Sequence, residues 1–300
     1  MAGRHAQEMT IAAEVVEKYA FETVDLNMGC PASKVVKSGS GSALLKDPEK
    51  IYDIVSAVRR ITKKPLSVKV RIGWSPSSIN IKEVSDAVQS AGADWITIHG
   101  RTRQDDYSVP VNLHLIADMK SHLKIPVIGN GNIFCGSDAE FMIKETAVDG
   151  IMVARGALGN PWIFSDIKQK MSRKSENDEN LGNLENRAIT PEEWRRIILM
   201  HIEFQEDLYI EREQSISAKR MVRKFDAASM GAICLRKHLL WYSKGWRNSK
   251  RLREKINVVA SLNEARNIID EFANYLIENG IKERAFLGDE AKLTHRFITS

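Results

Sequence analysis

Five short apolar runs, each followed by enough chain for a helix, most constrain how this sequence can fold. They are Val24–Met28, Leu66–Arg71, Trp95–His99, Pro126–Gly129 and Gly150–Ala154. The runs are largely continuous rather than alternating between apolar and polar residues, as is typical of parallel strands that are buried on both faces. Successive runs begin 24 to 42 residues apart. This spacing predicts a βα repeat and therefore a parallel α/β fold.

The segments between these runs carry the signals of amphipathic helices. Asp47 and Pro48 predict a helix start, because aspartate caps free backbone N–H groups and proline fits the first helical position. The apolar residues that follow form one stripe: Ile51, Ile54, Val55, Val58 and Ile61. Similar signals predict a helix over Ile81–Ala91 that ends at Gly92, and helix starts at Ser137-Asp138 and at Asn160-Pro161.

The last third of the chain shows no strand signal. Residues 172–190 are polar and charged and are interpreted as a linker. Thr190 and Pro191, with two glutamates after them, predict a helix start, and apolar residues then recur at helical spacing to about Gly280. A length of 300 residues allows about two domains. We expect an α/β domain over 1–171, the linker over 172–190, a helical domain over 191–280 and a tail over 281–300.

Composition excludes several classes of protein. With 43% hydrophobic and 28% charged residues, the chain is neither disordered nor collagen-like. No apolar run is long enough to span a membrane, and the first residues lack the apolar core of a secretory signal. Cys30, Cys135 and Cys234 lie too far apart to suggest a disulfide framework or a zinc site. We therefore expect a cytoplasmic protein without a metal.

The net charge of +5 is unevenly distributed. Between Lys219 and Ile256, twelve basic residues face only two acids, and Trp241, Tyr242 and Trp246 lie among them. Such a segment favours an RNA partner, because basic side chains attract phosphates and aromatic rings stack on unpaired bases. The alternative is that the charges are solvated helix faces and the aromatic residues belong to the core.

Polar or flexible residues follow each predicted strand. In a parallel barrel, active-site groups lie at the carboxyl ends of the strands. The residues expected there are Cys30, Lys69, His99, Arg101, Arg103, Asn130, Gly131, Asn132, Ala154 and Arg155. A single cysteine or histidine at such a place is more often a core residue, but an unpaired buried lysine such as Lys69 is costly. The two Gly-containing turns, together with Arg155, predict an anion site that suits a phosphate.

Several ordered segments of the chain resemble the tRNA-dihydrouridine synthases. The most specific are Asn-Met-Gly-Cys-Pro at 27–31, Ile-His-Gly-Arg-Thr at 98–102 and Asn-Pro-Trp-Ile-Phe at 160–164. Supporting segments are Gly41–Leu45, Lys69–Trp74, Gly129–Ile133, Ala154–Gly156 and Ala232–Tyr242. The resemblance runs from about residue 3 to 280 and is strongest to bacterial-type members. It implies a (β/α)8 TIM barrel that binds FMN, followed by a helical tRNA-binding domain.

The resemblance also implies an activity and a role for each candidate residue. Members of this family reduce the C5=C6 bond of uridines in tRNA, and NADPH recharges the flavin. Cys30 would protonate C5 as the general acid while reduced FMN delivers hydride to C6. A thiol suits this role because free thiols are mostly protonated near neutral pH. Lys69 and His99 would approach the flavin ring, and Asn130, Gly131, Asn132, Ala154 and Arg155 its phosphate. The residues expected to contact tRNA are Arg101, Arg103, Arg236, Lys237, Lys244 and Arg247.

One departure from the family pattern affects the expected fold. The family barrel has three strands before the Asn-Met-Gly-Cys-Pro strand, so we expect an N-terminally incomplete barrel with about five strands. Such a sheet leaves edges uncovered. Two alternatives remain beside an active monomeric synthase: a non-catalytic RNA-binding remnant of this family, and another FMN-dependent barrel oxidoreductase such as a dihydroorotate dehydrogenase.

Overall fold

A computed structural model of the chain describes residues 1–172, 188–215 and 227–284. The described chain forms two compact units that divide between Arg155 and Gly156. This division lies before the boundary at residue 171 that was expected from the sequence. Most of the expected linker, 172–190, and most of the expected tail, 281–300, lie outside the described residues.

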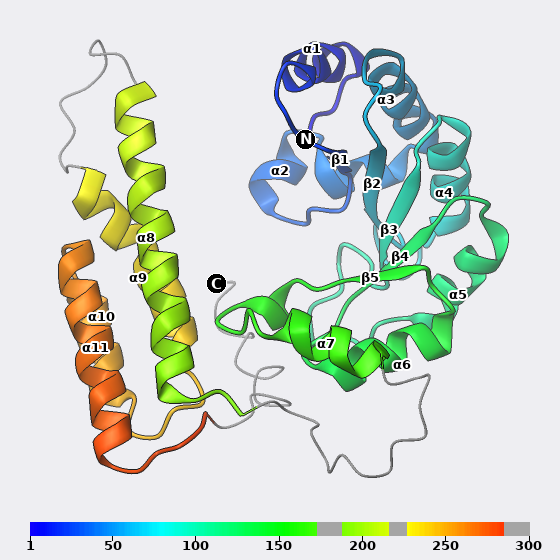
Figure 1. Ribbon diagram of the computed structural model, residues 1–300. Coiled ribbons are helices and arrows are strands. Elements are labelled where there is room, and N and C mark those ends of the chain that lie inside the picture. Colours follow the sequence, from blue (N-terminus) through cyan, green and yellow to red (C-terminus); the bar gives the residue numbers. More distant parts are fainter. Residues whose placement is uncertain (173–187, 216–226, 285–300) are drawn as a thin grey trace. The chain divides into compact units, whose positions relative to one another are not determined.

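The first unit is built on one parallel sheet of five strands (Figure 1). The strands are β1 (Val24–Asn27), β2 (Leu66–Arg71), β3 (Trp95–His99), β4 (Val127–Asn130) and β5 (Gly150–Met152). They pair in chain order, and every pairing is parallel. The parallel α/β fold predicted from the sequence is therefore confirmed, and β2 and β3 have the predicted bounds.

Helices alternate with the strands along the chain, beginning with α1 before β1. They are α1 (Ala6–Glu17), α2 (Ser33–Lys37), α3 (Pro48–Ile61), α4 (Ile81–Ser90), α5 (Leu113–His122) and α6 (Gly136–Thr146), with 3₁₀ helices η1 (Gly41–Lys46) and η2 (Arg155–Ala157). Contacts run from α1 to α3, α3 to α4, α4 to α5 and α5 to α6, so these helices form a continuous layer (Figure 1). Their apolar faces and the strands enclose one core, which includes Ile51, Val68 and Ile98. The side chain of Asp47 accepts from the N–H of Lys50 and caps α3 as predicted.

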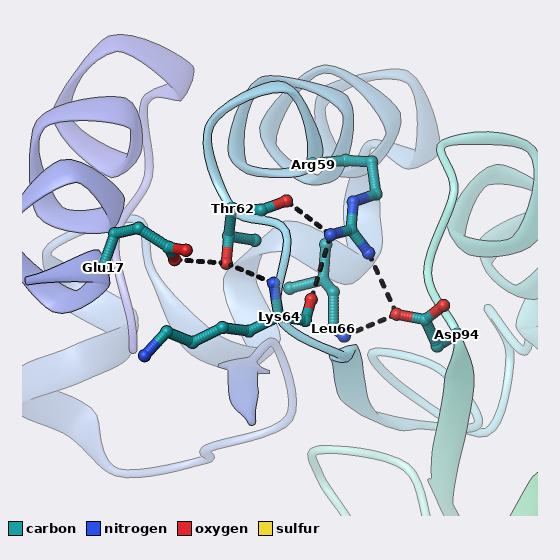
Figure 2. A network of polar contacts seen from close by, with 6 residues as sticks. All are labelled: Glu17, Arg59, Thr62, Lys64, Leu66 and Asp94. Carbon is teal, nitrogen blue, oxygen red and sulfur yellow. Dashed lines mark hydrogen bonds and ion pairs between the residues drawn. The ribbon is translucent and has the colours of Figure 1, made fainter. Parts of the chain in front are cut away.

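A polar network holds the amino-terminal ends of β2 and β3 together (Figure 2). Arg59 Nη1 donates to Asp94 Oδ2 at 2.9 Å, and its other terminal nitrogen donates to the carbonyl oxygens of Thr62 and Lys64. Asp94, which precedes β3, also accepts from the N–H of Leu66, the first residue of β2, at 2.6 Å. Glu17 accepts from the Thr62 hydroxyl at 2.7 Å and ties the end of α1 to the same turn. This edge of the sheet is therefore stabilised by paired polar groups, which leaves the opposite edge for function.

The exposed edge of β1 is paired with the first residue of the chain. The carbonyl of Met1 accepts from the N–H of Asn27 at 2.8 Å, and the terminal ammonium of Met1 donates to the carbonyl of Asp25. This is the hydrogen-bond pattern of a parallel bridge opposite Leu26. The start of the chain thereby extends the sheet by one residue position beside β1.

The described part of the second unit is helical. It contains α7 (Ile163–Ser172), α8 (Pro191–Ser215), α9 (Ala227–Tyr242), α10 (Lys250–Val258) and α11 (Leu262–Glu278). Its core is aromatic: Trp194 is fully buried, its Nε1 donates to the carbonyl of Tyr242, and its ring packs edge-on against Trp246 and Phe272. The helix expected to open at Asn160-Pro161 begins instead at Ile163, because residues 160–162 form a turn closed by the bond from the Ile163 N–H to the Asn160 carbonyl.

Arg284 holds three parts of this unit together. Its Nε donates to the carbonyl of Lys244 and its Nη1 to the carbonyl of Gly159, at 2.6 and 2.7 Å, while its guanidinium lies over the Trp162 ring. Gly159 has a φ of +70°, and an added Cβ would lie 2.4 Å from backbone atoms of Trp241. A glycine is therefore required where this loop packs against the end of α9.

Candidate active site

The register of the sheet brings the predicted residues to one edge. Asn27 pairs with Lys69 across β1 and β2, and Arg71, His99 and Asn130 lie side by side on β2, β3 and β4. Because all five strands are parallel, the loops that follow them leave from the same edge. This edge lies opposite the network of Figure 2.

The loop that carries Cys30 is held on both sides by hydrogen bonds. Asn27 Oδ1 accepts from the N–H groups of Gly29 and Cys30, at 3.2 and 3.0 Å. The carbonyl of Cys30 accepts from both the N–H and the hydroxyl of Ser42, at 3.1 and 2.9 Å. Cys30 is half-buried and has a free thiol. The thiol is thus presented from a loop whose backbone is fixed by η1.

Gly41 makes the close contact between η1 and the Cys30 loop possible. Its φ is +59°, in the left-handed region that favours glycine. An added Cβ would lie 2.8 Å from the Cys30 carbonyl oxygen and 3.2 Å from the Cys30 Cβ. Only a residue without a side chain allows Ser42 to reach the carbonyl it binds.

Lys69 lies on β2 with its ammonium largely withdrawn from water. Burial and the neighbouring Arg71 lower the pKa of Lys69 to about 8, while Asp25 and Cys30 act in the opposite direction. Asp25 is engaged by the hydroxyl of Ser67 at 2.6 Å. An additional negative group beside Lys69 would restore its charged form.

Arg71 lies at the same edge, although the sequence prediction assigned it no role in the site. Its side chain is buried, with Nε donating to the carbonyl of Gly29 and Nη1 to the carbonyl of Thr102, at 3.1 and 2.6 Å. It therefore joins the loop after β1 to the loop after β3. The sequence signal that could have identified it is an arginine at the end of an otherwise apolar strand, two residues after Lys69.

His99 is kept neutral at this edge. The pKa of His99 is lowered to about 2. Burial is the largest cause, and the positive charges of its neighbours lower the pKa further: Arg71, Lys69, Arg101 and Arg155. Its Nε2 lies 3.4 Å from Arg101 Nη1. A guanidinium can only donate, so Nε2 accepts and the proton of the neutral ring is assigned to Nδ1. The imidazole can therefore donate a hydrogen bond from Nδ1 without carrying charge.

Arg101 and Arg155 meet at the side chain of Asn132. Asn132 Oδ1 accepts from Arg101 Nη2 at 3.1 Å and from Arg155 Nη2 at 3.3 Å. Tyr107, which the sequence prediction did not single out, lies against both: its ring centre is 3.5 Å from Arg155 Cζ and 5.8 Å from Arg101 Cζ. Because Tyr107 lies in an irregular loop, no periodic signal in the sequence marked it.

Arg101 and Arg103 occupy different environments, although both were expected to contact tRNA. Arg101 is only 1% exposed and donates to the carbonyls of Val109 and Tyr107. Its guanidinium therefore shapes the site from within and is not offered at the surface. Arg103 is partly exposed and lies over the ring of Trp74.

The turn after β4 contains two consecutive residues with positive φ. Gly131 and Asn132 both have positive φ, at +132° and +53°. Asn130 is buried, and its Nδ2 donates to the carbonyl of Met152 on β5 at 2.8 Å, which fixes β4 against the last strand. Ala154 is exposed where the chain leaves β5. The turn is therefore held in place at the carboxyl edge of the sheet.

The side chains at this edge fit a phosphate-bearing, partly anionic ligand. Lys69, Arg71, Arg101 and Arg155 gather around His99, whereas the acids that act on them are Asp25 and Asp105. Arg155 Nη1 is buried and has no hydrogen-bond partner among the described residues. Arg71 and Arg101 are buried and Lys69 and Arg155 are partly buried; such cations are costly where they outnumber their acids, unless a negative group joins them. The residues present therefore suit the phosphate and electron-poor ring of a flavin nucleotide.

The basic residues expected to bind tRNA divide into two kinds. Arg236 donates to the carbonyl of Val259 at the end of α10. Lys244 is half-buried; its burial lowers its pKa most, and the nearby charge of Arg284 lowers it further. Lys237 and Arg247 are exposed. Four basic residues of the charged segment, Lys219, Arg220, Arg223 and Lys224, lie outside the described residues.

The aromatic residues of this segment are mainly structural. Tyr242 and Trp246 are 7% and 4% exposed and belong to the core of the helical unit, so the expectation that they stack on bases is wrong. Their rings fill the space around Trp162 and Trp194 instead. Trp241 is less buried and packs edge-on against His238.

The described residues contain no group of three or more His, Cys, Asp or Glu side chains that could hold a metal ion. Across the same ranges, no helix is both long enough and apolar enough to span a membrane.

Fold and site together define a parallel α/β protein with a polar, cation-rich site at the carboxyl edge of its strands. The model of the family described as Dihydrouridine synthase (Dus) matches residues 1–277. The chain is 34% identical over 284 residues to a probable tRNA-dihydrouridine synthase of Rickettsia conorii, covering 94% of this chain and 78% of that protein. It is 30% identical to tRNA-dihydrouridine synthase B of Pasteurella multocida, a match that covers 92% of this chain and 76% of that protein. It is also 30% identical to tRNA-dihydrouridine synthase B of Shewanella oneidensis, a match that covers 93% of this chain and 78% of that protein. The chain belongs to the dihydrouridine synthase family.

Proposed function

We propose that this protein is a tRNA-dihydrouridine synthase, an oxidoreductase that reduces the C5=C6 bond of a uridine in tRNA. The observation that carries the proposal is the placement of a free Cys30 thiol at the same sheet edge as the buried cations, in a chain of this family. The same membership disfavours a dihydroorotate dehydrogenase. Since the substrate is tRNA, we further propose a cytoplasmic location, and a monomer remains the prediction.

FMN is the proposed cofactor. Its phosphate would be held by the side chains of Asn132 and Arg155, the turn at Gly131 and the exposed Ala154. Asn130 would keep that turn in place through its bond to β5. Lys69 and the neutral His99 would lie along its ring. When bound, FMN supplies the hydride for C6 of uridine, and NADPH is the proposed source of its electrons.

Cys30 is the proposed general acid for C5. Its loop is fixed through Asn27 on one side and Ser42 on the other, so the thiol can be held at one distance from the base. A thiol that starts protonated delivers its proton as the carbanion character at C5 develops. Arg71 would act as a positioning residue, because it binds the carbonyl of Gly29 beside Cys30.

The helical unit is the proposed tRNA-binding part. Lys237 and Arg247 are exposed and would contact phosphates, whereas Arg236 and Lys244 would contribute mainly by holding helix ends and through the field of their charges. Contacts of this kind give an affinity that falls as salt rises. The choice of uridine would then depend on how this unit orients the tRNA.

Expression in a bacterial strain that lacks its own dihydrouridine synthases tests the proposal. We expect the purified protein to show flavin absorbance and the tRNA of the strain to regain dihydrouridine. A strain carrying Cys30→Ala controls for expression and folding, since this variant should retain flavin. A colourless protein that binds tRNA and restores no dihydrouridine would contradict the proposal and favour the non-catalytic RNA-binding alternative.

A further inference from the structure

Two cationic side chains lie over the ring of Trp74, a residue with no part in the site described above. Lys46 Nζ is 3.7 Å from the centre of the ring, and Arg103 Cζ is 4.8 Å from it. Lys46 ends η1, Trp74 follows β2 and Arg103 follows β3. Three separate loops of the carboxyl edge therefore converge on one indole, and we refer to Lys46, Trp74 and Arg103 as the Trp74 cluster.

Backbone hydrogen bonds connect the Trp74 cluster to the site. The N–H of Arg103 donates to the carbonyl of Gly73 at 2.9 Å, and the N–H of Gln104 donates to the carbonyl of Trp74 at 3.2 Å. At its other end, η1 binds the carbonyl of Cys30 through Ser42. The cluster is thus held in a fixed relation to the Cys30 loop rather than on an independent loop.

The charges of the cluster are not neutralised by carboxylates. Within the described ranges neither Lys46 nor Arg103 forms an ion pair, and Arg103 Nε is buried without a hydrogen-bond partner. The face of an indole attracts cations but leaves their charge intact. Each of the two cations therefore keeps a charge that an anion could neutralise.

The Trp74 cluster is more exposed than the two buried arginines of the flavin site. Lys46 is exposed and Arg103 and Trp74 are partly exposed, whereas Arg71 and Arg101 are buried. A site at the rim, fixed relative to Cys30, is suited to the part of a large substrate that remains outside. In RNA that part is the sugar-phosphate backbone next to the reacting nucleotide.

We propose that the Trp74 cluster binds a backbone phosphate of the tRNA next to the uridine that is reduced, and so positions that uridine over Cys30. This inference rests on the proposed function. Lys46 and Arg103 would contact the phosphate oxygens, while Trp74 holds both cations in place and offers its ring edge to the adjoining sugar. Phosphates of the nicotinamide nucleotide share the same chemistry, and the experiment below separates the two sources.

Variants of Lys46 and Trp74 test the proposal in the flavin-loaded protein. Lys46→Met removes one charge and keeps the length of the side chain, and Lys63→Met is the matched control, since Lys63 is exposed between α3 and β2 at the opposite edge of the sheet. Binding of fluorescent tRNA is measured by anisotropy over a series of salt concentrations. Reduction of the bound flavin by NADPH is measured separately without tRNA.

We expect Lys46→Met to weaken tRNA binding by roughly threefold to tenfold and to lower the slope of log affinity against log salt by about one, as for one lost phosphate contact. Trp74→Leu should weaken binding similarly, and Trp74→Phe less, because the phenyl ring still attracts the cations. Lys63→Met should leave the slope unchanged, and no variant should slow flavin reduction.

Unchanged affinity and slope in Lys46→Met would overturn the proposal. So would slower reduction by NADPH with unaltered tRNA binding, which would assign the cluster to the phosphates of the reductant. The proposed function fails on a different result: a wild-type protein that forms no dihydrouridine. If Lys46→Met still lowered the salt slope of such a protein, the phosphate site would stand without the activity.

Discussion

Arg155 lies over the ring of Tyr107, with its guanidinium carbon 3.5 Å from the ring centre. One terminal nitrogen donates to Asn132 Oδ1, and the other is buried without a hydrogen-bond partner in the described chain. A buried N–H donor without an acceptor is costly unless a further group joins it. We therefore propose that Arg155 contributes to binding the phosphate of FMN.

Arg155→Met should therefore reduce the affinity for FMN much more than the affinity for riboflavin, which lacks the phosphate. A hydrogen bond to a charged group contributes about 1.5–3 kcal/mol, so we expect roughly a 10- to 100-fold loss for FMN and little change for riboflavin. Quenching of flavin fluorescence measures both. Arg60→Met, at an exposed position of α3, is the matched control. Equal losses for the two flavins would show that Arg155 does not bind the phosphate.

The lowered pKa of Lys69 predicts a pH dependence of flavin binding. The free protein releases this proton near pH 8, whereas an unperturbed lysine keeps it to about 10.5. An anionic ligand raises the pKa again, so binding above pH 8 takes up a proton and weakens by up to about tenfold per pH unit. Titrations between about pH 7 and 9.5 should show this slope, and Lys69→Met should remove it. An identical slope in the variant would assign the proton to another group.

The same shift predicts how the stability of the free protein depends on pH. Between about pH 8 and 10.5 the unfolded chain holds a proton on Lys69 that the folded chain lacks. The contribution of Lys69 to the free energy of unfolding therefore rises with pH in this window and is smallest below it. Urea denaturation of wild type and Lys69→Met at pH 7 and 9.5 measures the difference.

Gly41→Ala should damage the Cys30 loop more than a second glycine substitution nearby. Both Gly41 and Gly39 have positive φ, at +59° and +78°, but an added Cβ meets the Cys30 carbonyl at Gly41 and only the flexible Arg4 side chain at Gly39. The left-handed conformation alone costs about 1–2 kcal/mol with a side chain. We expect that loss for Gly39→Ala and a clearly larger one for Gly41→Ala in urea denaturation. Similar losses would mean that the contact with Cys30 can relax.

The sequence predicted those features of the fold that depend on local pattern. The bounds of β2 and β3 and the capping of α3 by Asp47 follow from continuous apolar runs and a known cap, and the structure has them as predicted. The start of β4 lies one residue later than predicted, at Val127, since Pro126 has no N–H to donate to a neighbouring strand. Local chemistry explains both the successes and this difference.

Features that depend on tertiary packing could not be predicted in this way. Nothing in the spacing of Tyr242 and Trp246 indicates that the end of α9 and the loop after it turn these rings into the core rather than toward RNA. The burial of Arg101 and the stacking of Tyr107 on Arg155 depend on an irregular loop folding back over the site. Similarly, the Trp74 cluster brings together Lys46 and Arg103, which are far apart in the sequence.

The proposed role of Cys30 as general acid is tested by comparing wild type with Cys30→Ala in a single turnover. Each protein is loaded with FMN, reduced with NADPH and mixed with tRNA that lacks dihydrouridine, and uridine reduction is followed by mass spectrometry. We predict that wild type forms dihydrouridine and that Cys30→Ala, with the same flavin content and the same rate of reduction by NADPH, is slower by about 10²–10⁴-fold, the usual effect of losing a general acid. Equal rates in the two proteins, or no dihydrouridine with wild type, would contradict the account.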